Sequence, residues 1–110
     1  MPRTITPELR AVLEEDHRLC AEIPAEIPGC RAWVTVGAGF QNDAISVFGV
    51  THFEFRIEWM EREYDPSGDE LPVFEVQRFR TEAELNAHLL RILPESANLI
   101  RVADDPDYPM

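Results

Sequence analysis

The chain has 110 residues, 45% of them hydrophobic, which is the size of a single domain with one core. Its 21 acidic and 10 basic residues give a formal net charge of −11. This charge repels nucleic-acid backbones and anionic lipid surfaces, and it favours fast, salt-sensitive association with a basic protein.

Two observations bear on the compartment. The N-terminus meets charge and proline before any apolar run, so we expect no secretory signal, and the longest uncharged run, residues 32–42, is too short to cross a bilayer. Two cysteines are too few for a disulfide scaffold, so we expect free thiols in the cytoplasm. A short loop could still bring Cys20 and Cys30 into bridging range.

The first predicted element is a helix over residues 7–22. Thr6 can cap its first turn, and Pro7 and Glu8 are favourable at a helix start. Helical periodicity then places Asp16 near the centre of the apolar arc. We expect Asp16 to pair with an arginine or a backbone donor, and a functional buried carboxylate is the alternative.

After a proline-containing connection, residues 31–37 predict a strand, and residues 39–43 supply the residues of a hairpin turn. The spacing of Gly37 and Gly39 is also interpreted as part of this turn. The next strand begins near Ala44. One long or bulged strand through Gly49 is favoured, because it would keep Ile45, Val47 and Phe53 on one face. Two strands with a tight turn at residues 49–52 would also fit.

Apolar and polar residues alternate through residues 51–60, a pattern typical of a strand with one buried and one open face. The expected buried row consists of Phe53, Phe55, Ile57 and Trp59. The expected open row consists of His52, Glu54, Arg56, Glu58 and Met60.

The remaining chain predicts a hairpin loop over 61–70, a strand over 71–79, and a helix that begins at Thr81 with Glu84 completing a capping box. Its buried stripe is Leu85, Leu89, Ile92 and Leu93, and Pro94 ends it. Residues 99–102 predict a short strand. The expected fold is α+β, with an antiparallel sheet of four to five strands and both helices packed on one face. Residues 1–103 form the predicted domain, and residues 104–110 an acidic flexible tail.

No motif predicts catalysis, a cofactor or a metal site. Gly37 and Gly39 lack the third glycine of a dinucleotide loop, and the acids at 65 and 69 lack the glycine and glutamate of a calcium loop. His52 and Glu54 share a strand face without further ligands, and His17 and His88 have no metal spacing. We therefore expect a protein that is not an enzyme.

The charged loop after the central strand predicts a binding surface, because an aromatic anchor rimmed by acids suits capture of a basic protein. The expected partner-binding residues are Glu54, Glu58, Glu61, Glu63, Tyr64, Asp65, Asp69 and Glu70. In size, acidity and absence of catalytic motifs the chain is similar to the toxin-immunity proteins of bacterial competition systems, a likeness that no motif carries. It implies a monomer or weak homodimer that blocks the active site of a basic partner such as a nuclease toxin.

Two other functions fit the same composition. A secretion chaperone would be dimeric, with exposed apolar grooves for an unfolded segment. A small-ligand or enzyme domain would centre on Asp16 with His17 or His88, in a pocket between the helices and the sheet.

Overall fold

The computed structural model describes residues 2–109. They form a five-stranded sheet in the order β4-β3-β2-β1-β5, with every neighbouring pair antiparallel. This confirms the predicted α+β fold. Along the chain the elements are α1 (Pro7–Glu14), β1 (Leu19–Ile23), β2 (Cys30–Gln41), β3 (Ala44–Arg56), α2 (Ile57–Glu61), η1 (Gly68–Glu70), β4 (Val73–Phe79), α3 (Glu82–Ile92), β5 (Ile100–Arg101) and η2 (Val102–Asp104).

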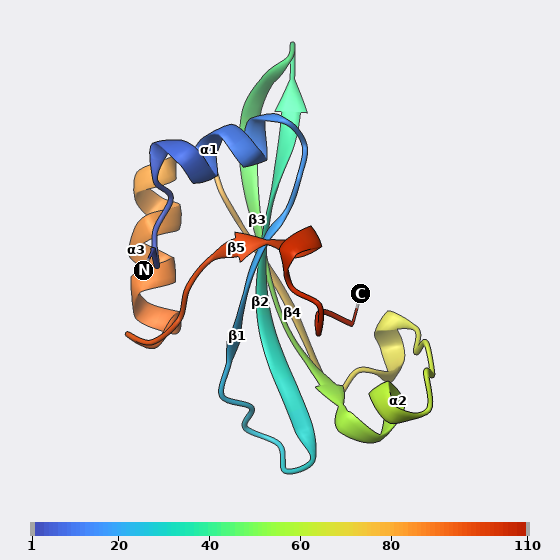
Figure 1. The fold of residues 1–110 in the computed structure, drawn as a ribbon. Coiled ribbons are helices and arrows are strands. Elements are labelled where there is room, and N and C mark those ends of the chain that lie inside the picture. Colours follow the sequence, from blue (N-terminus) through green and yellow to red (C-terminus); the bar gives the residue numbers. More distant parts are fainter. Residues whose placement is uncertain (1, 110) are drawn as a thin grey trace.

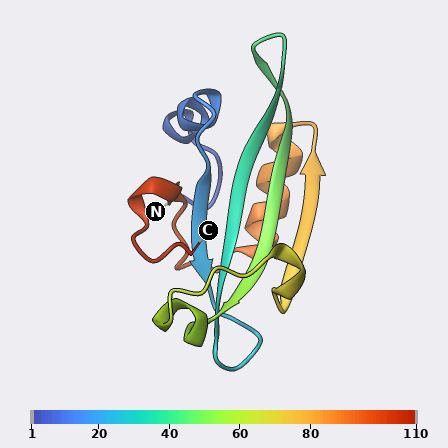
Figure 2. The same ribbon diagram turned by 90° about the vertical axis from the view of Figure 1, so that its right-hand side faces the viewer.

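Both faces of the sheet are packed. Figure 1 shows α1 and α3 on one side of the sheet, as predicted, with α2 and the C-terminal segment on the other. Figure 2 looks onto that second side. The core under α1 and α3 includes Leu13, Leu19, Ala21, Val34, Val36, Phe48, Val50, Leu85, Leu89 and Leu93. The core on the second face contains Cys20, Trp33, Phe53, Phe55, Trp59 and Leu71. The prediction of one open face is therefore wrong.

The first helix is shorter than predicted. α1 begins with Thr6 accepting a hydrogen bond from the Leu9 amide and ends at Glu14, and Asp16 follows it in the left-handed conformation (φ 61°). Residues 19–23 form β1, which pairs with β2 on one side and with β5 on the other. These non-local pairings override the helical periodicity. Asp16 is exposed, so neither predicted role for a buried carboxylate applies.

β2 and β3 form the longest hairpin, and they turn at Asn42 and Asp43, which both have positive φ (53° and 63°). Two left-handed residues suit a tight hairpin turn, and Asn and Asp tolerate that conformation. The turn thus lies within the predicted range, but Gly37 and Gly39 are part of β2. Their assignment to the turn was wrong, because the Asn-Asp pair makes the turn without them.

β3 is one continuous strand, as favoured, and it contains a bulge. The register shifts between Gly39 and Phe40, which leaves Ser46 unpaired. Because a bulge changes which face the residues on either side of it occupy, Ile45 packs against the core under α1 and α3 whereas Val47 faces the opposite side. The two residues do not share a face, contrary to the prediction.

The alternating stretch 51–60 is not a single strand, because β3 ends at Arg56 and α2 begins at Ile57. Phe55 and Trp59 are buried and pack edge to face with ring centroids 5.3 Å apart, as expected for core residues. Ile57 is 38% exposed, so its core assignment was wrong. In a helix, residues two apart point about 200° apart, and Ile57 therefore leaves the face that Trp59 occupies.

α3 begins where the sequence predicts. The Thr81 hydroxyl accepts from the Glu84 amide and donates to the Glu84 carboxylate, and the helix ends at Ile92. Leu93 is extended before Pro94, as a residue that precedes proline favours. Among residues 2–109 no helix is long and apolar enough to span a membrane.

Candidate functional site

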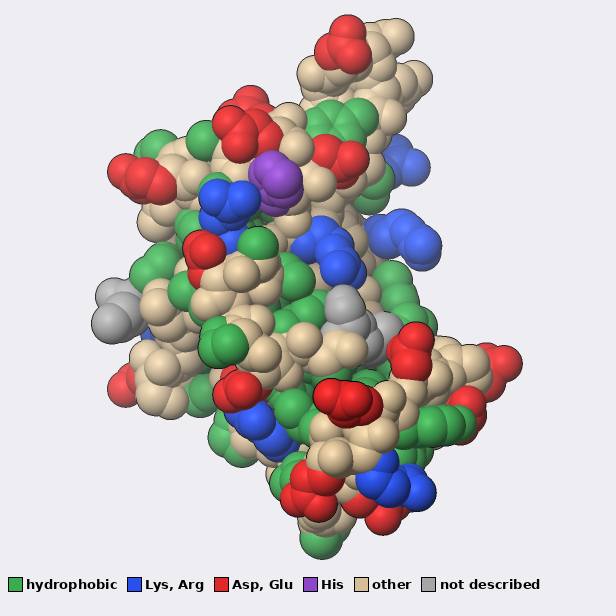
Figure 3. All heavy atoms as spheres, turned by 45° about the vertical axis from the view of Figure 1, so that its right-hand side comes forward, with side chains coloured by type: hydrophobic (Ala, Val, Ile, Leu, Met, Phe, Trp, Pro, Cys, Tyr) green, Lys and Arg blue, Asp and Glu red, His purple; other side chains and the backbone are tan. Residues whose placement is uncertain are grey.

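Seven of the eight predicted partner-binding residues lie together at one end of the molecule. We call Glu58, Glu61, Glu63, Tyr64, Asp65, Asp69 and Glu70 the acidic end. All seven are exposed. Residues 57–70 contain six acids and one arginine, so they carry −5 of the formal charge of −11. Figure 3 shows acidic side chains gathered over this part of the molecule, at the lower right.

Trp59 anchors the acidic end to the core. Its ring is buried, and its carbonyl accepts a hydrogen bond from the Tyr64 amide at 2.9 Å. The Tyr64 ring lies 5.8 Å from that of Trp59 and is 43% exposed. Glu63, which precedes it, adopts the left-handed conformation (φ 55°) and turns the chain back. The tyrosine is thus held against a core residue while one side of its ring faces solvent.

Glu70 closes the loop. Its carboxylate accepts from the Tyr64 hydroxyl at 2.5 Å and from the Ser67 amide at 3.1 Å. These hydrogen bonds hold the pKa of Glu70 below its usual value, and the bond from Tyr64 has the larger effect. The same hydrogen bond raises the pKa of Tyr64. Glu70 is therefore ionised at neutral pH. Because these contacts already order the loop, less conformational entropy would be lost when a partner binds.

Glu54 does not belong to this surface, and its predicted role in partner binding is wrong. Its side chain is fully buried (0% exposed). The carboxylate accepts from the backbone amides of Glu26 and Ile27 at 2.9 and 3.1 Å. The loop between β1 and β2 folds over this end of the sheet and encloses the carboxylate. No local sequence pattern indicates that contact, because residues 26 and 54 are far apart in the chain.

A cavity of about 600 Å³ lies between α3 and the sheet. Its polar lining includes His52, Glu75, Gln77, His88 and Arg91. The His52 Nε2 atom is buried and has no hydrogen-bond partner among the described residues, and its Nδ1 lies 4.0 Å from a Glu75 oxygen. This is the kind of pocket that the small-ligand alternative predicts. The small-ligand alternative also named Asp16 and His17, and neither residue lines this cavity.

His88 is the buried histidine of that cavity. Its Nδ1 lies 2.9 Å from an Arg91 guanidinium nitrogen. Because a guanidinium only donates, Nδ1 accepts and the ring proton of the neutral histidine is on Nε2. Burial, and secondarily the Arg91 charge, lower the pKa of His88. The imidazole is therefore held in its neutral form.

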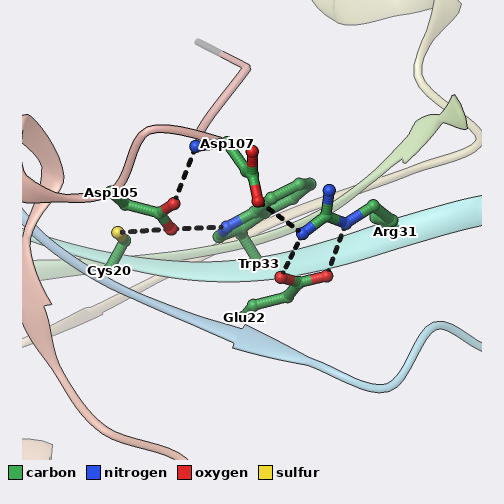
Figure 4. A network of polar contacts seen from close by, with 6 residues as sticks. All are labelled: Cys20, Glu22, Arg31, Trp33, Asp105 and Asp107. Atoms are coloured by element: carbon green, nitrogen blue, oxygen red, sulfur yellow. Dashed lines mark hydrogen bonds and ion pairs between the residues drawn. The ribbon is translucent and has the colours of Figure 1, made fainter. Parts of the chain in front are cut away.

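The C-terminal segment packs onto the second face of the sheet, which corrects the prediction of a solvated flexible tail; Met110 lies outside the described residues. Figure 4 shows Asp105 accepting hydrogen bonds from the Trp33 indole at 3.1 Å and the Cys20 thiol at 3.7 Å. Tyr108 shares a 2.8 Å hydrogen bond with the Thr35 hydroxyl. A buried indole N–H and a buried hydroxyl need partners, and this segment supplies them.

The two cysteines are unbridged and buried. Burial, and then the charge of Asp105, raise the pKa of Cys20 to about 12. Burial likewise raises the pKa of Cys30. A reactive thiol needs its thiolate form, so neither environment favours a nucleophile.

Across residues 2–109 no three His, Cys, Asp or Glu side chains group together as metal ligands would. The chain matches no known protein family, no curated protein and no solved structure.

Proposed function

We propose that the protein is a small inhibitor of a basic protein partner, similar in action to the toxin-immunity proteins and acting in the cytoplasm. The observation that carries the proposal is the preorganised acidic end, where −5 of charge surrounds one half-exposed tyrosine. The expected partner is a nuclease toxin or another protein with a basic active site. Occlusion of that site would require no chemistry from the inhibitor.

Two physical effects would give affinity. The carboxylates of the acidic end would occupy positions that substrate phosphates take in the partner, and they would steer association at a rate that falls as salt rises. Tyr64 would supply the apolar contact area near the centre of the interface. Because Trp59 and Glu70 already position Tyr64, little ordering would be needed on binding.

The test is affinity capture from the source cell, followed by measurement of the captured partner's dissociation constant at two salt concentrations. We expect a basic protein that is toxic alone. Replacing Glu58, Glu61, Asp65 and Asp69 together by alanine should weaken binding by at least about 100-fold. A close interfacial charge pair contributes roughly 1.5 kcal/mol or more, so the loss of two such pairs among the four already gives that factor.

The matched control replaces four exposed acids elsewhere, namely Glu8, Glu14, Glu15 and Glu95. It changes the net charge by the same amount and leaves the acidic end intact, so it should retain most of the affinity. If both quadruple variants lose the same affinity, only net charge matters and the proposed surface is wrong. A captured partner that is acidic or neutral would reject the proposal as a whole.

A further inference from the structure

A second hollow, of about 380 Å³, lies on the face of the sheet that carries the C-terminal segment. Strands β2, β3 and β4 form its floor and one wall, and the opposite side is closed by Arg18 and Tyr108. The floor residues pair across β2 and β3, with Thr35 opposite Thr51 and Gly37 opposite Gly49. None of these residues belongs to the acidic end.

The two floor glycines are not required by the fold. Neither has a positive φ. A Cβ at Gly49 would meet no atom within 4 Å, and one at Gly37 would lie 3.6 Å from the Arg18 Cγ, an ordinary contact. Gly39 differs, since its Cβ would come within 2.7 Å of a Val47 methyl carbon.

Glycine inside a strand lowers stability relative to alanine, because it loses more conformational freedom on folding. It is found where a ligand or another backbone approaches closely. The adjacent Gly37 and Gly49 therefore keep open a space that folding alone would allow side chains to fill.

Two arginines flank this floor from opposite sides. Arg78 on β4 pairs with Gly49 in the ladder, and the Arg18 stem lies beside Gly37. The Arg18 guanidinium carbon is 5.8 Å from the centre of the Tyr108 ring. No salt bridge within residues 2–109 involves either arginine, although Arg10 and Arg31 have acidic partners.

In a chain of net charge −11, two guanidiniums that face one hollow without an acidic partner form a local positive site. Figure 3 shows several basic side chains close together across the middle of the face that it presents. A guanidinium binds carboxylate or phosphate through two parallel hydrogen bonds. The wall residue Phe74 is 48% exposed, so the hollow also offers an apolar surface.

We propose that this hollow binds a small organic anion, a carboxylate or phosphate monoester attached to an aromatic or apolar group. The anionic group lies over the glycine floor between Arg18 and Arg78, and the apolar group lies beside it against Phe74. This site is separate from the acidic end and does not depend on the proposed inhibitory function.

The test is a titration of the ¹⁵N-labelled full chain with phenyl phosphate and with benzoate, followed by amide NMR. We expect saturable shifts of the Gly37 and Gly49 amides with a dissociation constant on the order of 1 mM, as suits a ligand of this size. The probe with the lower dissociation constant shows whether the site prefers a phosphate monoester or a carboxylate. Phenol, which lacks the charge, and inorganic phosphate, which lacks the ring, should bind at least tenfold more weakly.

Two variants locate the binding. Arg78→Gln should weaken it about tenfold or more, because a hydrogen bond to a charged group is worth about 1.5–3 kcal/mol. Arg62→Gln makes the same charge change in the acidic end and should have no effect. Gly49→Val should abolish binding while thermal stability stays equal or rises.

Three results would overturn the proposal. The first is the absence of saturable shifts with either anion. The second is binding that Arg78→Gln and Gly49→Val leave unchanged. The third is a Gly49→Val protein that is clearly less stable than wild type, because it would show that the fold itself requires the glycine.

Discussion

Replacing Glu54 by glutamine tests the largest difference between the predicted and observed surfaces. The buried carboxylate accepts one backbone hydrogen bond at each oxygen, from the amides of Glu26 and Ile27. Glutamine keeps the shape but offers one acceptor oxygen, so one amide would face the NH₂ group without a partner. A hydrogen bond to a charged group is worth about 1.5–3 kcal/mol, and we expect Glu54→Gln to lower the free energy of unfolding by about 2–3 kcal/mol. That is a large share of a typical total of roughly 5–15 kcal/mol.

The assay is urea denaturation followed by tryptophan fluorescence, with amide hydrogen exchange as a second readout. The midpoint should fall without a change in slope, and the amides of residues 26 and 27 should lose protection. Glu58→Gln is the matched control, because Glu58 was predicted on the same row as Glu54 but is exposed. It should alter stability by less than about 0.5 kcal/mol. If Glu54→Gln were equally mild, the carboxylate would not hold the loop between β1 and β2.

Two further predictions concern other buried polar groups. Asp105→Ala should lower the free energy of unfolding by about 2 kcal/mol, because it leaves the buried Trp33 indole N–H unpaired; an unchanged urea midpoint would mean that the Asp105 hydrogen bond contributes nothing to stability. The lowered pKa of His88 should make stability fall with acidification. The neutral histidine contributes fully above the unfolded pKa of 6.5, and this contribution is lost as pH falls through the lower folded pKa. His88→Leu should flatten that part of a stability curve measured between pH 8 and about pH 5, and an identical slope would refute the assignment.

Part of the site could be predicted from the sequence. A dense run of acids in a turn-rich loop favours solvent, and the seven residues of the acidic end are exposed as expected. The position of Glu54 could not be predicted, because strand alternation gives the face of a residue and not what covers that face. The hollow between Arg18 and Arg78 was also missed, since it depends on the pairing of β2, β3 and β4. Gly37 and Gly49 carried the only local signal, and the glycine at 37 was assigned to a turn.

Elements that depend only on local interactions can be predicted from the amino-acid sequence. The cap at Thr81 and the start of α3, the hairpin turn near Asn42, and the burial of Phe53 and Phe55 all follow from neighbouring residues and periodicity. Residues 19–23 form a strand because of tertiary contacts: all five pair with β2, and Leu19 and Cys20 pair with β5 as well, whereas a helix there would forgo these hydrogen bonds. Tertiary structure also decided that both sheet faces are covered. Hydrogen bonds between residues far apart in the chain satisfy the buried polar groups, and no pattern in the neighbouring sequence predicts those bonds.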